Sequence, residues 1–393
     1  MYLHLMSAAQ QPATQQSFRG LGRRLERFAW CFRSYFIPSH LRTYRELVQN
    51  HALQTGDAER TLVCFDFTQV DIDASTGRYL FALVTDFEAL GHLTCYMANF
   101  RFLATMRHKR HKRLLLQRPF RVCKSLHEIR LDRLALLITD RETIPPGFSG
   151  RAVRVCYDPR WPKQINEVAM TFGIHPELYD VFEQAPPPNL TEHRPWRVFF
   201  AGTTVGARYG HDLLRSRFGK MSRVEILHTL VAKLPATRIR RILSEADLAS
   251  DNPTPPSFVW AGTGEYRIPW NQWHSTLDKS AFFLACPGVE MPLCHNLVEA
   301  LARGSVPILE HPEFLEPAMT HDVNCLEFKG QDELIATFER IFQMPEPEIQ
   351  RLRAGAMAYY REHLAAGRFA SKLLNHPHTQ VDLFLNAYRV PKA

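Results

Sequence analysis

Short apolar runs of strand length alternate with longer amphipathic segments along most of the chain. The run at 61–67 (TLVCFDF) predicts a buried strand, and 77–90 predicts a helix that ends at Gly91. Further apolar runs predict strands at 92–98, 134–139 and 152–157. Near-continuous apolar strands that alternate with helices are typical of a parallel sheet covered on both faces.

The same alternation restarts after a proline-rich segment at 183–196 (EQAPPPNLTEHRPW), which predicts a stiff connector between two domains. The strands expected beyond it are 197–201, 258–261, 281–286, 305–309 and 324–328. The expected helices are 211–234, 268–277, 295–303, 332–342, 346–366 and 368–388. We therefore predict an α/β chain with two Rossmann-like parallel-sheet domains facing across a cleft, and ligands beyond the carboxyl ends of the strands.

This division predicts five segments. They are an N-terminal extension with a basic, aromatic helix (1–60), a first α/β domain (61–183), a linker (184–196), a second α/β domain (197–370) and a C-terminal helix packing back on the first domain (371–393). A length of 393 residues suits two such domains, and 45% hydrophobic with 22% charged residues is ordinary globular composition.

Composition also indicates the cellular compartment of the protein and the charge of its partners. No run approaches the roughly 18 apolar residues of a membrane span, and residues 1–16 lack the pattern of a signal peptide. The eight cysteines include no CxxC pair, and most lie in apolar runs, as buried thiols do in a reducing compartment. We expect a cytoplasmic protein without a metal. The net charge of +8 favours acidic partners.

The segment 286–309 (CPGVEMPLCHNLVEALARGSVPIL) carries the clearest chemistry. An apolar strand ends at Pro287-Gly288, and a helix begins near His295. Free N–H groups at a helix start suit a diphosphate, and a glycine lets the backbone approach a ligand closely. Glu299 in the first turns of this helix is placed to accept hydrogen bonds from a ribose hydroxyl. The alternative is a plain βαβ unit with a capped helix.

These residues resemble the C-terminal signature of exostosin-like glycosyltransferases and, more broadly, the donor domain of GT-B glycosyltransferases. The resemblance lies in Ser-x-Phe, Cys-Pro, Val-Glu-Ala-Leu and Gly-x-Val-Pro-Ile between 280 and 308, and in Val-Phe-Phe-Ala-Gly at 198–202. Asn296 stands where the family often has arginine. The resemblance implies a donor site that includes Gly202, Thr203, Arg208, Arg215, Pro287, Gly288, His295, Asn296 and Glu299.

The resemblance also implies that the first domain receives the acceptor, and that Asp71 or Asp73 acts as general base after the first strand. The alternative for the same two residues is polar spacing and capping before the helix. Cations of the basic stretch 208–223 are expected to stabilise the leaving diphosphate in place of a metal ion.

Two basic windows suggest partners. The windows 106–121 (MRHKRHKRLLLQRPFR) and 18–42 suit an acidic glycan, an anionic membrane surface or solvated helix faces; no nucleic-acid motif accompanies them.

We predict that the protein transfers a sugar from a UDP- or GDP-linked donor to a glycan or lipid-linked glycan, and that it needs no other cofactor. We expect it to act in the cytoplasm or at the inner face of a membrane. The alternatives are a non-catalytic transferase-like binding protein and an epimerase-type enzyme.

Overall fold

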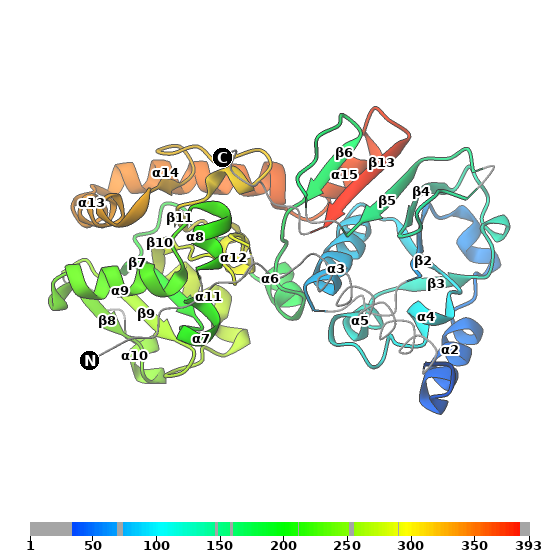
Figure 1. The fold of residues 1–393 in the computed structure, drawn as a ribbon, viewed down its shortest axis with the longest axis horizontal. Helices are drawn as coiled ribbons and strands as arrows, with labels where there is room; N and C mark the ends of the chain where they lie inside the picture. Colours follow the sequence, from blue (N-terminus) through cyan, green and yellow to red (C-terminus); the bar gives the residue numbers. More distant parts are fainter. Residues whose placement is uncertain are drawn as a thin grey trace, which may run out of the picture.

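The computed structural model describes residues 34–68, 74–145, 148–157, 160–210, 212–250, 255–289 and 291–385. They form two α/β domains that lie side by side (Figure 1). Each domain is built on one sheet, and every strand pairing in both sheets is parallel. The predicted fold class, two Rossmann-like parallel-sheet domains, is therefore confirmed.

The N-terminal domain contains a seven-stranded sheet in the order β3-β2-β1-β4-β5-β13-β6. Its strands are β1 (Leu62–Asp66), β2 (Leu93–Met97), β3 (Phe120–Cys123), β4 (Leu134–Thr139), β5 (Ala152–Cys156), β6 (Glu167–Met170) and β13 (Gln380–Leu385). Its helices are α2 (Pro38–Asn50), α3 (Ala74–Ala89), α4 (Phe100–Leu103), α5 (Arg110–Leu115) and α6 (Tyr179–Gln184), with short 3₁₀ turns η1 (Thr55–Glu59), η2 (Leu126–Glu128) and η3 (Pro176–Leu178).

The C-terminal domain contains a six-stranded sheet in the order β12-β11-β10-β7-β9-β8. Its strands are β7 (Trp196–Gly202), β8 (Ile239–Arg241), β9 (Phe258–Gly262), β10 (Ser280–Leu284), β11 (Val306–Leu309) and β12 (Leu326–Glu327). Its α-helices are α7 (Gly206–Tyr209), α8 (Leu213–Phe218), α9 (Arg223–Lys233), α10 (Glu245–Ala249), α11 (Trp273–Asp278), α12 (His295–Ala302), α13 (Gly330–Gln343) and α14 (Glu346–Tyr359). Three 3₁₀ turns complete it: η4 (Ala236–Arg238), η5 (Trp270–Gln272) and η6 (Pro312–Phe314).

The end of the chain departs from the prediction of a helix over 371–393. After α14 the chain continues through a π-helical turn, η7 (Tyr360–Leu364), and the short helix α15 (Arg368–Leu374), and then becomes strand β13. This strand lies between β5 and β6 of the N-terminal sheet (red in Figure 1). The alternation of Val381, Leu383 and Leu385 with other residues suits a strand, and all three are buried.

The helix expected over 211–234 is also wrong, because the segment is divided into α8 and α9. Gly219 after α8 has φ +65°, a left-handed conformation that ends a helix. Ser222 then begins α9 with a capping box, in which its side chain accepts from the Glu225 N–H and the Glu225 carboxylate accepts from the Ser222 N–H. The break directs the start of α9 toward the carboxyl end of β7.

The proline-rich linker is fixed to the C-terminal domain by buried arginines. Arg353 of α14 donates to the carbonyl oxygens of Asn189 and Glu192, each at 2.8 Å. Arg194 donates to the Ser280 and Arg303 carbonyl oxygens at 2.7 and 2.5 Å. Buried guanidinium groups thus hydrogen-bond backbone carbonyls of the linker and of the C-terminal domain, and they hold the connector in one conformation.

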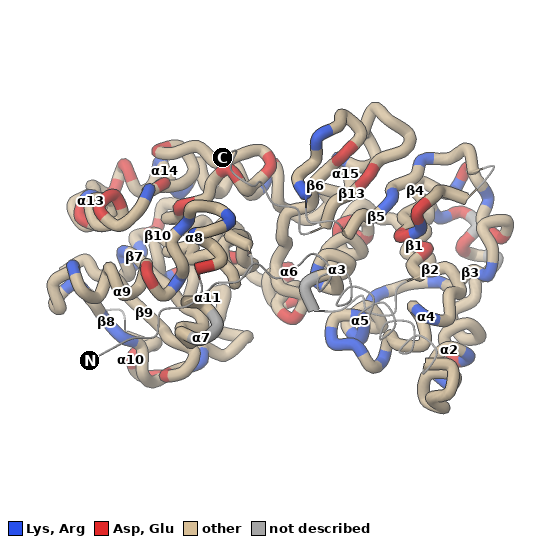
Figure 2. The backbone as a smooth tube through the Cα atoms, in the orientation of Figure 1, with Lys and Arg blue, Asp and Glu red and all other residues tan. Residues whose placement is uncertain are grey.

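Most cations of the basic window 106–121 have partners within the N-terminal domain. Lys112 is fully buried and donates to the Phe102 carbonyl oxygen at 3.2 Å and the Thr105 hydroxyl at 2.9 Å. Arg110 binds Glu177 through two hydrogen bonds of 2.6 Å each. Figure 2 shows these cations around α4 and α5. The other ion pairs of the window are Arg107–Glu46, Arg118–Glu88, Arg118–Asp180 and Arg121–Asp57.

The second basic window, 18–42, lies mostly in residues 1–33, outside the described part of the chain. Of the helix expected there, the structure describes only the beginning of α2, which packs on α4 and β3. Within the described part of the chain, every helix is too short or too polar to span a lipid bilayer.

Candidate functional site

A cavity of about 300 Å³ lies beyond the carboxyl ends of β7 and β9, against the start of α12. The loops after parallel strands meet at this edge of an open α/β sheet. Its lining combines aromatic and polar side chains, and one lining residue comes from the N-terminal domain. The lining residues are His175, Ala201, Gly202, Thr203, Tyr209, Ala261, Thr263, Tyr266, Arg267, Ile268, Trp270, Trp273, Cys294, His295, Asn296 and Glu299.

The cavity brings together five of the predicted donor-site residues, namely Gly202, Thr203, His295, Asn296 and Glu299. The first two end β7 and begin its loop, and the other three lie on the first turns of α12. The backbone of α12 follows the predicted helix at 295–303 within one residue.

Glu299 links the cavity to both domains. Its Oε1 accepts from the His175 backbone N–H at 3.1 Å, and its Oε2 accepts from the Trp273 indole N–H at 2.8 Å. The residue is only 3% exposed. Burial raises the pKa of Glu299 to about 7, although both hydrogen bonds and the charge of Arg78 act in the opposite direction. Each carboxylate oxygen keeps a further lone pair for a ligand hydroxyl.

His295 is a neutral acceptor in this site. Its Nδ1 lies 2.7 Å from the Gly173 carbonyl oxygen, and since a carbonyl only accepts, Nδ1 carries the proton. Burial, followed by the charge of Arg78, holds the pKa of His295 well below its usual range. Nε2 therefore presents a lone pair, which suits a ligand hydroxyl or N–H. A neutral imidazole does not supply a phosphate-facing cation in place of the arginine that the family often has at position 296.

Two lining residues carry buried polar atoms without a hydrogen-bond partner among the described residues. They are His295 Nε2 and Asn296 Oδ1, and both belong to the first turn of α12. The N-cap residue Cys294 makes no side-chain hydrogen bond to that turn. Buried polar groups are normally satisfied, so unpartnered ones beside a cavity indicate a place for a polar ligand.

Arg223, the first residue of α9, supplies a buried positive charge behind the helix start. Its Nη1 donates to the Thr203 carbonyl oxygen at 3.1 Å, and its Nη2 donates to the Pro287 carbonyl oxygen at 2.9 Å. Nη2 also lies 3.4 Å from Cys294 Sγ, and the guanidinium stacks 4.0 Å over the Tyr209 ring. One arginine, from the basic stretch 208–223, thus joins the β7 loop, the β10 loop and the start of α12.

Pro287 and Gly288 do not line the cavity but shape the loop behind it. The Gly288 N–H donates to the Pro292 carbonyl oxygen at 3.2 Å. A Cβ at this position would lie 2.7 Å from the Met291 carbonyl oxygen. The close approach that requires glycine is therefore made by the chain's own loop, whereas the sequence suggested approach to a ligand.

Arg215 lies away from the cavity. Its guanidinium pairs with Glu225 at 2.6 Å, and its side chain is 56% exposed. The remaining predicted residues are not placed: Asp71 and Asp73 lie outside the described residues, as does the side chain of Arg208. The carboxylate at the end of β1, Asp66, is buried in an ion pair with Arg141.

The aromatic wall was missed by sequence analysis. Tyr266, Trp270 and Trp273 follow the carboxyl end of β9, and this position was the signal that could have identified them. His175 stacks on Trp270 with ring centroids 5.4 Å apart and planes 24° apart. His175 comes from the other domain, 95 residues before Trp270 in the sequence, so no local pattern connects the two.

Arg78 of α3 brings a second cation to this region from the N-terminal domain. Its charge acts on Glu299, His295 and Cys294. Burial, and then the neighbouring charge of Arg110, lowers the pKa of Arg78. Its Nε is buried without a partner among the described residues. This guanidinium therefore lies close enough to the start of α12 to act on it electrostatically, and its Nε keeps a hydrogen bond to offer.

No family model matches this sequence, and no curated protein matches it. Among solved structures, the chain is similar to a glycosyltransferase from Rickettsia africae, with 9% identity and a TM-score of 0.45 over 80% of this chain and 97% of that one. It is similar to an alpha-glucosyltransferase in complex with UDP and DNA (13% identity, TM-score 0.40, 80% and 98% covered). It is also similar to the T4 phage BGT in complex with its UDP-glucose substrate (10% identity, TM-score 0.36, 80% and 99% covered). At such distances, substrate and reaction have to be argued from the residues of this chain.

Proposed function

We propose that this protein is a glycosyltransferase that transfers a sugar from a UDP- or GDP-linked donor to an acceptor hydroxyl. The observation that carries the proposal is the cavity at the start of α12, which is lined by aromatic side chains and by His295 and Asn296 with their unpartnered polar atoms. An aromatic wall suits a nucleobase, and a helix start with a nearby buried arginine suits a diphosphate. The resemblance of 280–308 to exostosin-like donor domains supports the same assignment.

In this proposal the donor is bound by three groups of residues. The base stacks on the wall that contains Trp270, and Glu299 accepts from a ribose hydroxyl with its remaining lone pairs. The diphosphate lies at the α12 start, and Arg223 and Arg78 balance its charge. His295 Nε2 accepts a donor hydroxyl.

The chemical step requires stabilisation of the nucleoside diphosphate as it leaves. Backbone N–H groups and fixed cations supply this without reorganisation, which is how a metal-independent GT-B enzyme works. The N-terminal domain receives the acceptor, a glycan or lipid-linked glycan, across the cleft. Asp71 or Asp73, after β1, remains the proposed general base.

Thermal unfolding with a panel of UDP- and GDP-sugars tests donor binding. A ligand at 100 times its Kd stabilises the folded state by about 2.7 kcal/mol, which raises the unfolding midpoint by several degrees. Turnover is then measured as release of UDP or GDP with candidate acceptors. Failure of every nucleotide to shift the midpoint would refute the proposal, and binding without turnover would favour a non-catalytic binding protein.

Arginine variants locate the phosphate site. Arg223→Lys keeps the charge but loses the bridging geometry, so we expect nucleotide-sugar affinity to fall at least about tenfold. Asn296→Ala, which leaves the loops intact, is expected to weaken binding as well. Arg215→Ala is the matched control, because its exposed partner pair lies outside the cavity. Equal losses in Arg215→Ala and Arg223→Lys would place the diphosphate elsewhere.

A further inference from the structure

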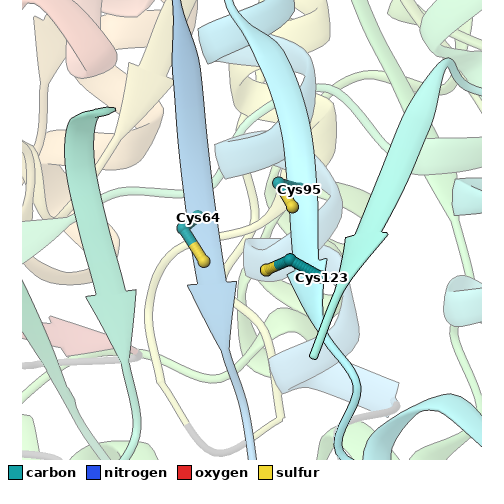
Figure 3. A group of neighbouring side chains, drawn as sticks. All are labelled: Cys64, Cys95 and Cys123. Atoms are coloured by element: carbon teal, nitrogen blue, oxygen red, sulfur yellow. The ribbon is translucent and has the colours of Figure 1, made fainter. Parts of the chain in front are cut away.

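Three buried cysteines meet on one face of the N-terminal sheet. Cys64 of β1, Cys95 of β2 and Cys123 of β3 come from adjacent strands, and Figure 3 shows their side chains directed toward one another. Their sulfur atoms all lie within 4.8 Å of one another, and each residue is fully buried. Within the described residues, no other three cysteine, histidine or acidic side chains converge in this way.

Strand register produces this convergence. Cys64 and Cys95 are direct partners in the pairing of β1 with β2. Cys123 is the partner of Met97, two residues beyond Cys95 on β2, and therefore on the same face. The Met97 thioether joins the group, with its Sδ 3.3 Å from Cys123 Sγ. Regular strand pairing thus brings the three thiols together, with the Met97 thioether beside Cys123.

The surroundings of the cluster are apolar and separate from the main core. The layer contains Leu62, Leu93, Ile129 and Leu137, together with the cysteines. The Cys123 thiol also lies 3.9 Å from the Tyr96 carbonyl oxygen. Cysteine binds metals as the thiolate.

The sulfur spacing matches a metal-binding geometry. With metal–sulfur bonds of about 2.3 Å, three thiolates around one ion lie about 4 Å apart. Small side-chain rotations within the observed 4.8 Å limit reach that arrangement without moving the strands. Hard cations such as Mg²⁺ and Ca²⁺ require oxygen ligands, and iron–sulfur clusters are typically held by four cysteines. Soft thiolate and thioether ligands select Cu(I) or Zn(II).

Two surface cavities adjoin the layer. Leu53, Leu62 and Ile129, which belong to or pack against it, line a cavity of about 350 Å³. A second cavity of about 330 Å³ is lined by Leu126, Ile129 and Phe148 of the same layer. The layer therefore lies next to the protein surface.

We propose that Cys64, Cys95 and Cys123 bind one soft d¹⁰ metal ion, Cu(I) or Zn(II), which joins the first three strands of the N-terminal sheet. Binding replaces the three S–H protons by the metal and releases them to solvent. The ion stabilises the domain and takes no part in sugar transfer. Its ligands come from three strands, each separated by about 30 residues, so no CxxC spacing reveals the site.

Metal retention by the reduced full-length protein tests the proposal. After incubation with one equivalent of Zn(II) or of Cu(I) and desalting, we expect elemental analysis to find one ion per chain and a higher unfolding midpoint. The arm that retains its ion identifies the metal. Cys64→Ala, Cys95→Ala and Cys123→Ala should each reduce retention at least tenfold. Cys325→Ala, a buried cysteine of the other domain, is the matched control and should retain the ion.

A second measurement covers the case in which the variants fold poorly. In the wild-type protein, bound metal should protect these three thiols from alkylation, as mapped by peptide mass spectrometry, and leave Cys156 and Cys325 unchanged. Absence of retention in both arms, retention by Cys123→Ala, or a disulfide between two of the three cysteines under these conditions would overturn the metal site.

Discussion

Glu299 is the residue at which the two domains and the cavity meet. Its hydrogen bonds to His175 and Trp273 connect the N-terminal domain, α11 and α12 through one carboxylate. Burial raises its pKa to about 7. When the folded-state pKa of a group lies above its unfolded-state pKa, the folded protein binds more protons than the unfolded chain at pH values between the two. Stability is therefore lost as pH rises through this window.

We predict that the wild-type protein loses up to about 3 kcal/mol of unfolding free energy, relative to Glu299→Gln, as pH rises from 4.5 to 7, because only the wild type must ionise a buried carboxyl. Urea unfolding of both proteins at several pH values measures the difference. Asp86 and Glu310 also titrate with raised pKa values, but both proteins retain them. Parallel pH profiles in the two proteins would contradict this prediction.

At the scale of elements, the places where helices end and approach one another decide the geometry of the site. The break after α8 places Arg223 at the start of α9, where it reaches three loops. Helix α14 also approaches a neighbouring segment closely. A Cβ on Gly355 would lie 2.0 Å from the Val323 carbonyl oxygen, so this helix can lie against the 320–325 loop only with glycine there.

Gly355→Ala is expected to destabilise the protein by about 1–3 kcal/mol through this overlap. Intrinsic helix propensity alone favours alanine by about 1 kcal/mol, so the sign of the effect separates the two causes. Exposed Ala354 in the same helix provides the reference, since Ala354→Gly should lose about 1 kcal/mol by propensity alone. Chemical denaturation measures both; a stabilised Gly355→Ala protein would disprove the close approach.

At the scale of the whole molecule, the chain crosses between the domains twice. It leaves the N-terminal domain through the linker after α6, and it returns through η7 and α15 to β13. Asp86 of α3 accepts from the N–H groups of Gly367 and Ala370, which fixes the start of α15 on the N-terminal domain. The N-terminal sheet is therefore completed only when the last strand pairs between β5 and β6.

Leu383→Ala, which removes a fully buried side chain of β13, should lower the unfolding free energy by about 2–5 kcal/mol. Hydrogen exchange should increase in β5 and β6, the two partners of β13, and remain unchanged in β7 to β12. Val231→Ala, at an exposed position of α9, should change stability by less than about 0.5 kcal/mol. Increased exchange confined to β13 itself would show that the sheet does not depend on it.

The amino-acid sequence by itself determined the two parallel-sheet domains, most central strands and α12. Continuous apolar runs such as 61–67 and 281–286 suit a central strand that is buried on both faces of a parallel sheet. Gly304 ends α12 because it adopts a left-handed backbone conformation. Glu299, His295 and Asn296 were likewise predicted to share a site, because they lie on one short helix. Patterns of this kind are local, so they can be followed along the chain.

Only the tertiary structure decided which groups from distant segments meet. It placed His175 of one domain on Trp270 of the other, inserted β13 between β5 and β6, and held three loops together with Arg223. Burial and the charge of Arg78 also lower the pKa of His295, and the contact with the Gly173 carbonyl oxygen fixes the proton on Nδ1. The three cysteines converge through strand register for the same reason: pairing between strands is a property of the folded sheet, and no spacing along the sequence encodes it.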